Sequence, residues 1–120
     1  MPIVRIDITG PQTPEHVHAI LRGTRASITS SLGVADGRIH LRVVETPASH
    51  VDAPACRTVR YTVIDIALYE GRTPELKAAC VAAIRAALAA DPGIEPSEVA
   101  VAFRDMSTLD LDVLPGEADE

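Results

Sequence analysis

The sequence predicts an α+β two-layer sandwich, in which a tandem βαβ repeat forms a four-stranded sheet with two helices on one face. Two observations predict this fold: the chain repeats itself after sixty residues, and each copy passes from strand to helix and back to strand periodicity. Placing Gly33 under Gly93 brings the Thr-Pro-Glu of residues 13–15 under that of residues 73–75 with no gap. One structural unit is therefore present twice.

The first copy contains all three elements of this unit. Aliphatic and charged residues alternate over residues 4–8, which is the two-residue period of a strand. Thr13 offers an N-cap oxygen to the next segment, and Pro14 supplies the fixed φ of a first helical position. Aliphatic residues then recur at helical spacing up to Gly33, which is placed to end the helix in a left-handed conformation. Residues 39–45 are expected to form the return strand.

The second copy repeats the order of the first. Residues 59–68 predict a strand, and residues 74 to about 90 predict a helix that Gly93 stops. Residues 98–104 predict the last strand. The segment between the copies, residues 46–57, contains proline and alanine and is expected to connect them.

These elements are expected to make one domain over residues 1–120, because this length allows a single ordinary core. Its pseudo-repeats are residues 1–45 and 58–105. A strand, a helix and a parallel strand connect in a right-handed sense, so both helices are expected on the same face of the sheet. The acidic tail, residues 107–120, contains proline and glycine and is expected to be irregular and able to wrap a neighbouring subunit.

The sheet face away from the helices is predicted to be covered by other subunits. Residues 99–103 are apolar at every position and residues 62–68 are nearly so, a pattern typical of strands buried on both faces. Two helices cover only one face, so we expect a symmetric oligomer packed with its sheets inward. Asp7 and Asp65, repeated at strand centres, are interpreted as hydrogen-bond acceptors between subunits.

Composition excludes several classes of partner. The chain has one Phe, two Tyr and no Trp, so aromatic surfaces that stack bases are scarce. Its net charge of −6 has the wrong sign for holding a phosphate backbone. No apolar run approaches the ~18 residues of a membrane span, and the N-terminus lacks the plan of a signal peptide. We therefore expect a cytoplasmic protein with no nucleic-acid or membrane partner.

The cysteines, Cys56 and Cys80, predict neither a disulfide framework nor a metal site. A chain that can bury its own core does not need disulfides, and neither cysteine has a second Cys or a His at metal-ligand spacing. We expect no metal and no cofactor.

Pro2 is the candidate for acid–base chemistry. Removal of Met1 would leave its nitrogen as a free secondary amine at the mouth of the first strand; if Met1 is retained, that nitrogen is an amide and the mechanism fails. The pKa of an α-amino group is near ~8, and burial lowers it by disfavouring the charged form. Such an amine can act as a general base or a general acid. The sole lysine, Lys77, lies inside a predicted helix, so few other amines are available.

Three features together resemble the tautomerase superfamily: the opening Met-Pro-Ile-Val-Arg-Ile-Asp-Ile, the doubled βαβ plan, and the Tyr-Glu-Gly-Arg-Thr-Pro-Glu-Leu-Lys of residues 69–77. Members include 4-oxalocrotonate tautomerase, malonate semialdehyde decarboxylase and cis-3-chloroacrylic acid dehalogenase. The resemblance covers nearly the whole chain, and the length is like that of the two-unit members. It implies the tautomerase (MIF-like) fold, a homotrimer and a small carboxylate-bearing substrate.

The resemblance also implies roles for individual residues. Pro2 matches the catalytic proline, acting as base or acid. Arg72 matches the arginine that binds the substrate carboxylate and polarises its carbonyl, a role suited to a bidentate fork. Gln12 stands where the first copy would have that arginine, and Arg60 near where the second would have the proline, so each chain keeps one complete site. His40 aligns with an arginine of the return strand in the short tautomerases; a protonated histidine could partly serve instead.

Departures from the family pattern narrow the expected reaction. A dehalogenase would need a His at Ile28, a second Arg at Tyr69 and a Tyr at Ala102, so we do not expect dehalogenation. The decarboxylases carry an Asp in the loop after the first helix; Asp36 lies in that loop here, while Glu70 replaces one of their arginines. We therefore expect keto–enol tautomerisation or isomerisation of a small 2-oxo acid or enol carboxylate. The alternatives are a malonate-semialdehyde-type decarboxylase or hydratase and a non-enzymatic trimeric small-molecule binding protein.

Each candidate also has a simpler structural interpretation. Asp36 precedes a glycine, which is strong turn chemistry, and Arg72 could pair locally at a helix start. Tyr69 and Phe103 either form an apolar wall that desolvates Pro2 or belong to the core. The remaining histidines are expected to be solvated: His16, His18 and His50.

Overall fold

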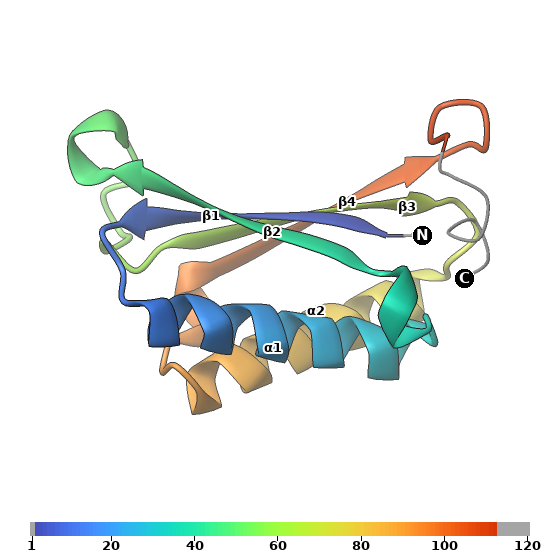
Figure 1. Ribbon diagram of the computed structural model, residues 1–120, viewed down its shortest axis with the longest axis horizontal. Coiled ribbons are helices and arrows are strands. Elements are labelled where there is room, and N and C mark those ends of the chain that lie inside the picture. The colour runs from blue at the N-terminus through green and yellow to red at the C-terminus, as the bar shows by residue number, and fades with distance from the viewer. Residues whose placement is uncertain (1, 113–120) are drawn as a thin grey trace.

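Four strands and two helices pack in two layers (Figure 1). The computed structural model describes residues 2–112. Short 3₁₀ helices, η1 to η3, precede or follow the return strands. In chain order the elements are β1 (Ile3–Gly10), α1 (Pro14–Leu32), η1 (Asp36–Arg38), β2 (His40–Pro47), η2 (Ala48–His50), β3 (Thr62–Tyr69), α2 (Pro74–Ala90), η3 (Pro96–Glu98) and β4 (Val99–Met106).

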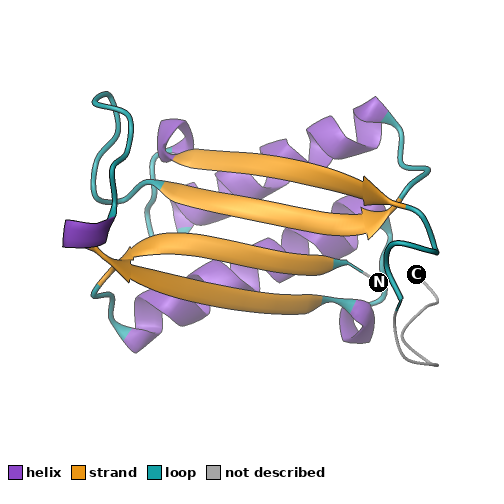
Figure 2. Ribbon diagram, turned by 90° about the horizontal axis from the view of Figure 1, so that it is seen from above, coloured by secondary structure: helices purple, strands orange, loops and turns teal. Residues whose placement is uncertain are grey.

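The sheet has the strand order β2-β1-β3-β4. Within each copy the two strands are parallel, and the copies join through antiparallel β1 and β3. Figure 2 shows both helices beneath one face of this sheet. The predicted α+β two-layer sandwich with a tandem βαβ repeat is confirmed.

The helices begin as the repeat predicts, with a threonine cap in each copy. Thr13 Oγ1 accepts a hydrogen bond from the His16 N–H at 3.2 Å, and Thr73 Oγ1 accepts one from the Leu76 N–H at 3.2 Å. Gly33 ends α1 in the left-handed region, with φ of 69°, as expected. Equal caps in equivalent places show that the copies share local chemistry as well as topology.

The end of α2 involves Pro92 as well as Gly93, which the sequence predicts to stop the helix. The helix ends at Ala90, and the Asp91 N–H donates to the Ala87 carbonyl at 3.0 Å. Pro92 has no N–H with which to continue the helix, so the regular turns end before Gly93. Gly93, with φ of 99°, then caps the helix, because its N–H and that of Ile94 both donate to the Leu88 carbonyl, at 2.9 and 2.8 Å.

Three strands also lie a few residues away from their expected bounds, because ladder pairing rather than local periodicity decides where a strand ends. The start of β3 is delayed by a turn in which the Tyr61 N–H donates to the Thr58 carbonyl at 3.1 Å. The predicted strands at residues 39–45, 59–68 and 98–104 are observed as His40–Pro47, Thr62–Tyr69 and Val99–Met106.

The core lies between the sheet and the helices and is almost wholly aliphatic. Gly23 on α1 faces α2, since a Cβ built there would lie 3.3 Å from Leu88 Cδ2. The absence of a side chain therefore lets the two helices approach closely. Fully buried members of this core include Ile6, Ile20, Ile28, Ile64, Ile66, Ile84 and Leu88.

The other face of the sheet is more polar than the apolar runs predicted. Arg5 Nε lies 3.0 Å from Asp7 Oδ1, and Arg104 Nη2 lies 2.8 Å from Asp65 Oδ2. Both aspartates interpreted as acceptors between subunits thus have arginine partners in their own chain. Ala102 is exposed on this face. Side chains along a strand point alternately to the two faces of the sheet. The aliphatic side chains of β1 and β3 therefore face the helices, and the charged ones between them lie on the open face.

Neither helix of residues 2–112 is long and apolar enough to cross a membrane. Two expectations concern residues that are not described. The fate of Met1 lies outside the described residues, as does the part of the acidic tail from residue 113 onward.

Candidate active site

Pro2 lies buried at the edge of the molecule where β1 begins. Its carbonyl accepts a hydrogen bond from the His40 N–H at 3.0 Å, which ties it to the start of β2. Pro2 lies two residues before the buried Val4, and residues two apart along a strand point to the same face. Its ring is therefore on the side of the sheet that faces the helices. The pyrrolidine therefore sits at the rim of the core, where an amine would be partly desolvated.

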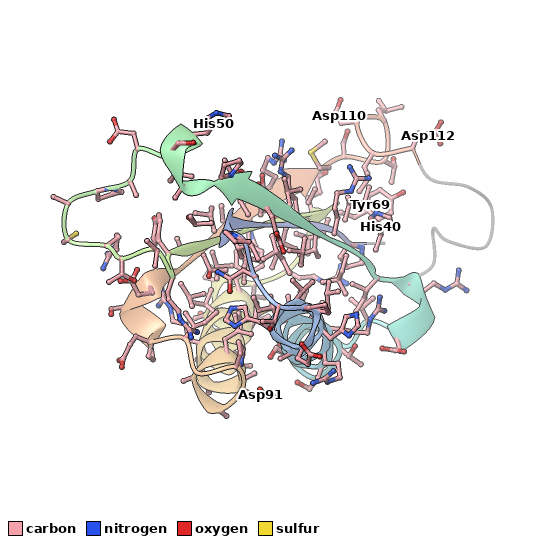
Figure 3. All side chains as sticks on the ribbon, turned by 60° about the vertical axis from the view of Figure 1, so that its left-hand side comes forward. His40, His50, Tyr69, Asp91, Asp110 and Asp112 are labelled. Atoms are coloured by element: carbon pink, nitrogen blue, oxygen red, sulfur yellow. The ribbon has the colours of Figure 1, made fainter. Side chains whose placement is uncertain are left out.

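The topology brings one end of each of the four strands to this end of the sheet. β1 and β2 start here, whereas β3 and β4 end here, because the two copies run antiparallel (Figure 1). Ile3 on β1 pairs with His40 on β2 at one side and with Ala67 on β3 at the other. Figure 3 shows His40 and Tyr69 at this end and His50 at the opposite end.

Arg72 lies in the short loop between β3 and α2, directly before the Thr73 cap. Its side chain is half-buried. Gly71 precedes it with φ of 121°, a conformation that L side chains rarely adopt. The glycine therefore lets the chain turn sharply between the end of β3 and the Thr73 cap.

Asp36 and His40 flank the turn that leads into β2. Asp36 begins η1 and is exposed, with its Oδ1 3.7 Å from Arg25 Nη1. His40 is exposed on the sheet face away from the helices, as is its ladder partner Ile3. The His40 imidazole and the Pro2 ring thus lie on opposite faces of the sheet. The hydrogen bond between the two residues is made by the His40 backbone.

Tyr69 and Phe103 have structural partners as well as a position near the site. The Tyr69 hydroxyl donates to the Leu111 carbonyl at 2.9 Å and holds the segment after β4 against the end of β3. Phe103 packs on the helix side of the sheet against the core, with Lys77 Nζ 5.8 Å from its ring centroid. Phe103 and Pro2 share a face of the sheet, which is compatible with an apolar wall.

Two further cations lie at this end that the sequence analysis did not propose for the site. Lys77 Nζ lies 2.7 Å from Asp105 Oδ2, and Asp105 pairs in register with Leu68 at the end of β3. Arg38, the last residue of η1, has a buried Nη1 for which residues 2–112 supply no hydrogen-bond acceptor. Arg38 lies only two residues before His40, which could have suggested it as a site residue. Local periodicity, however, does not tell where a side chain points in a 3₁₀ turn.

At the opposite end of the sheet, Gln12 and Arg60 stand at the places equivalent to Arg72 and Pro2. Gln12 Nε2 donates to the Thr9 carbonyl at 2.7 Å, a contact within its own turn, and Arg60 is exposed. His16 is half-buried here rather than solvated as expected, and burial, followed by the charge of Arg60, lowers its pKa below the usual 6.5. His18 and His50 are exposed, as expected.

A family model described as tautomerase enzyme matches residues 41–110, more than half of the chain. The chain belongs to the tautomerase family. No curated protein sequence matches it.

Solved structures resemble this chain along nearly their whole length. A fused 4-OT, described as a wild-type symmetric trimer, is 26% identical with a TM-score of 0.83, over 94% of this chain and 92% of that one. Malonate semialdehyde decarboxylase is 19% identical with a TM-score of 0.86, over 97% and 93%. A second one, FG41 malonate semialdehyde decarboxylase inhibited by 3-bromopropiolate, is 24% identical with a TM-score of 0.85, over 97% and 92%. The likeness to the two decarboxylases is one of fold.

Residues 2–112 contain no group of three or more His, Cys, Asp or Glu side chains that could hold a metal ion. The side chains gathered at the Pro2 end are guanidinium, carboxylate, imidazole and ammonium groups. Cationic groups of this kind can bind a small anion, and titratable groups can move a proton.

Proposed function

We propose that this protein is a tautomerase that uses the free amine of Pro2 to move a proton on a small 2-oxo acid or enol carboxylate. The supporting observation is the buried position of Pro2 at the end of the sheet where Arg72 and the 36–40 turn also lie. Membership of the tautomerase family supports the reaction class.

The proposed reaction needs one base and one cation. The neutral Pro2 nitrogen removes a proton from the enol oxygen or from the carbon beside the carbonyl, and returns it to a carbon of the same substrate. One bond to hydrogen breaks and one forms, with no net oxidation. Burial at the rim of the core favours the neutral amine at pH 7. Arg72 binds the substrate carboxylate and offsets the negative charge that develops on the carbonyl oxygen.

Arg38 is proposed as the second cation of the substrate site, in place of the His40 imidazole. Its buried Nη1 has a free hydrogen-bonding valence within the described chain, whereas the His40 side chain lies on the other face of the sheet. A buried donor with no partner is costly, and a ligand anion would satisfy it.

We also propose that the working form is a homotrimer packed through the open sheet face. Two fused 4-OT proteins of similar fold are described as trimers, one symmetric and one asymmetric. The exposure of Ala102 and Ile3 on this face agrees with a surface that partners cover.

The decisive experiment combines intact mass with turnover. We expect a mature chain lighter by one methionine that accelerates ketonisation of phenylenolpyruvate or 2-hydroxymuconate. Replacing Pro2 by alanine should lower kcat by about 10²-fold or more, because general acid–base catalysis contributes that much. Unchanged activity in P2A, or a retained Met1 in an active protein, would refute the mechanism.

Arginine variants test the binding role with a matched control. Arg72→Ala should raise KM about tenfold with a smaller change in kcat, as loss of a charge-assisted contact does. Arg60→Ala, at the Pro2-equivalent position of the second copy, should change neither constant. Equal effects of the two variants would mean that Arg72 acts through net charge rather than through contact.

Decarboxylation is the second candidate reaction, and the placement of the Asp36 carboxylate at the Pro2 end favours it. Supplying malonate semialdehyde and measuring acetaldehyde distinguishes the two reactions. Faster release of acetaldehyde than ketonisation of any enol, abolished by Asp36→Asn, would replace tautomerisation as the proposal. Binding of these acids without turnover of either substrate would favour the non-enzymatic binding protein.

A further inference from the structure

A guanidinium group on α1 spans the turn before β2. Arg25 Nη1 donates to the Asp36 carbonyl at 2.5 Å, and Nη2 donates to the Ile39 carbonyl at 3.1 Å. The same Nη1 lies 3.7 Å from Asp36 Oδ1. With about a third of its side chain exposed, Arg25 thus joins the middle of a helix to both ends of η1. The planar fork suits this role, since it presents several donors in fixed directions.

This contact continues directly to Pro2. His40 follows Ile39, and its N–H donates to the Pro2 carbonyl at 3.0 Å. One peptide unit therefore has its carbonyl held by Arg25 and its N–H bound to Pro2. The turn between the two Arg25 contacts also carries Arg38, proposed above as the second cation. Loss of the guanidinium would release both carbonyls to water and allow the turn, and with it Pro2, to shift.

The second copy contains the same contact sixty residues later. Arg85 Nε and Nη2 donate to the Val99 carbonyl at 3.1 and 3.0 Å, and Val99 is the equivalent of Ile39. The arginine contact is therefore part of the βαβ unit itself. Only in the first copy does it lead to a proline, because the second copy has Arg60 at that place.

We infer that Arg25 is a positioning residue, which fixes the 36–40 turn and, through the His40 N–H, the place of Pro2. This inference rests on the proposed function of Pro2. Arg25 touches neither the substrate nor the reacting atoms; it acts through the backbone. A displacement of about 1 Å at a reacting group costs as much as 10² in rate, so a contact of this kind can matter without touching the substrate.

The test compares Arg25→Met with Arg85→Met, because both remove an arginine contact to the carbonyl before the second strand of a copy, Ile39 or Val99, and Arg25→Met also removes the contacts to Asp36. Both should lower Tm. Only R25M should lower kcat, by about tenfold or more. Only R25M should also shift the apparent pKa that the pH–rate profile gives for the Pro2 amine. Arg25→Lys, which keeps one donor group and the charge, should recover part of kcat.

Hydrogen exchange supplies a readout that does not depend on turnover. In R25M the His40 amide should exchange at least about tenfold faster than in the unchanged protein, whereas R85M should leave it protected. Protection of the His40 amide in R25M, or an equal loss of kcat in both variants, would overturn the inference. Absence of turnover in the unchanged protein would instead refute the proposed function, and the exchange result would still decide whether Arg25 positions Pro2.

Discussion

Burial separates the two thiols of this chain. Cys80 lies on the core face of α2 with no exposed surface, whereas Cys56 is exposed in the connection between the copies. Burial raises the pKa of the Cys80 thiol, and a hydrogen bond with Ser31 offsets part of this effect. The thiolate is the reactive form, so both the raised pKa and the lack of access protect Cys80.

A thiol reagent should therefore modify one cysteine quickly in the folded protein. We expect Cys56→Ser to abolish the fast reaction and Cys80→Ser to leave it unchanged, as followed by absorbance of a released aromatic thiolate. Denaturant should expose the second thiol. Two fast thiols in the folded protein would contradict the packing described for α2.

At the scale of the element, the two threonine caps are equal in geometry but unequal in position. Thr13 and Thr73 each accept a hydrogen bond from a first-turn N–H at 3.2 Å. Thr13 lies at the end of the sheet away from Pro2. Thr73 directly follows Arg72, so its cap sets the direction in which the loop enters α2. The same local chemistry thus supports the fold in one copy and the candidate site in the other.

Removing the caps should separate these two contributions. Thr13→Ala and Thr73→Ala should each lower the free energy of unfolding by about 1 kcal/mol in chemical denaturation. Only T73A should also raise KM, because it loosens the loop that carries Arg72. Serine variants, which keep the hydroxyl, should restore stability in both places. A KM increase in T13A as large as that in T73A would argue against a local effect.

At the scale of the whole molecule, the open sheet face is the feature that one chain leaves unfinished. Its arginine–aspartate pairs are largely exposed and contribute little by themselves. If another subunit covers this face, however, each aspartate is buried together with its arginine partner. The cost of burying an unpaired carboxylate is then avoided. The helix side of the sheet is complete, since the core there is already buried. An assembly is therefore expected to use the open face.

A bulky charge on each side of the molecule tests this expectation. Ala102→Arg, on the open face of β4, should convert a trimer into monomers, as measured by light scattering after size-exclusion chromatography. Ala82→Arg, on the exposed side of α2, should leave the trimer intact. If the unchanged protein is a monomer, or if A102R remains trimeric, the open face is not the interface.

Local pattern determined much of this protein. The sixty-residue repeat, the period of two over residues 4–8 and the Thr-Pro-Glu starts predict the two βαβ units and their helix N-termini, because each depends on contacts between near neighbours. The confirmed fold class follows from these features. Pro2 and Arg72 could be proposed from their motif, without knowledge of their surroundings.

The tertiary structure decided what depends on distant contacts. It placed Arg25 on the Asp36 and Ile39 carbonyls, left the buried Arg38 Nη1 without an acceptor among residues 2–112, and set the ends of the strands through their pairing partners. Periodicity tells which face of an element is apolar, but it does not tell where a long side chain ends or which backbone group it meets. Those contacts join residues eleven or more positions apart, and only packing of the two layers brings them together.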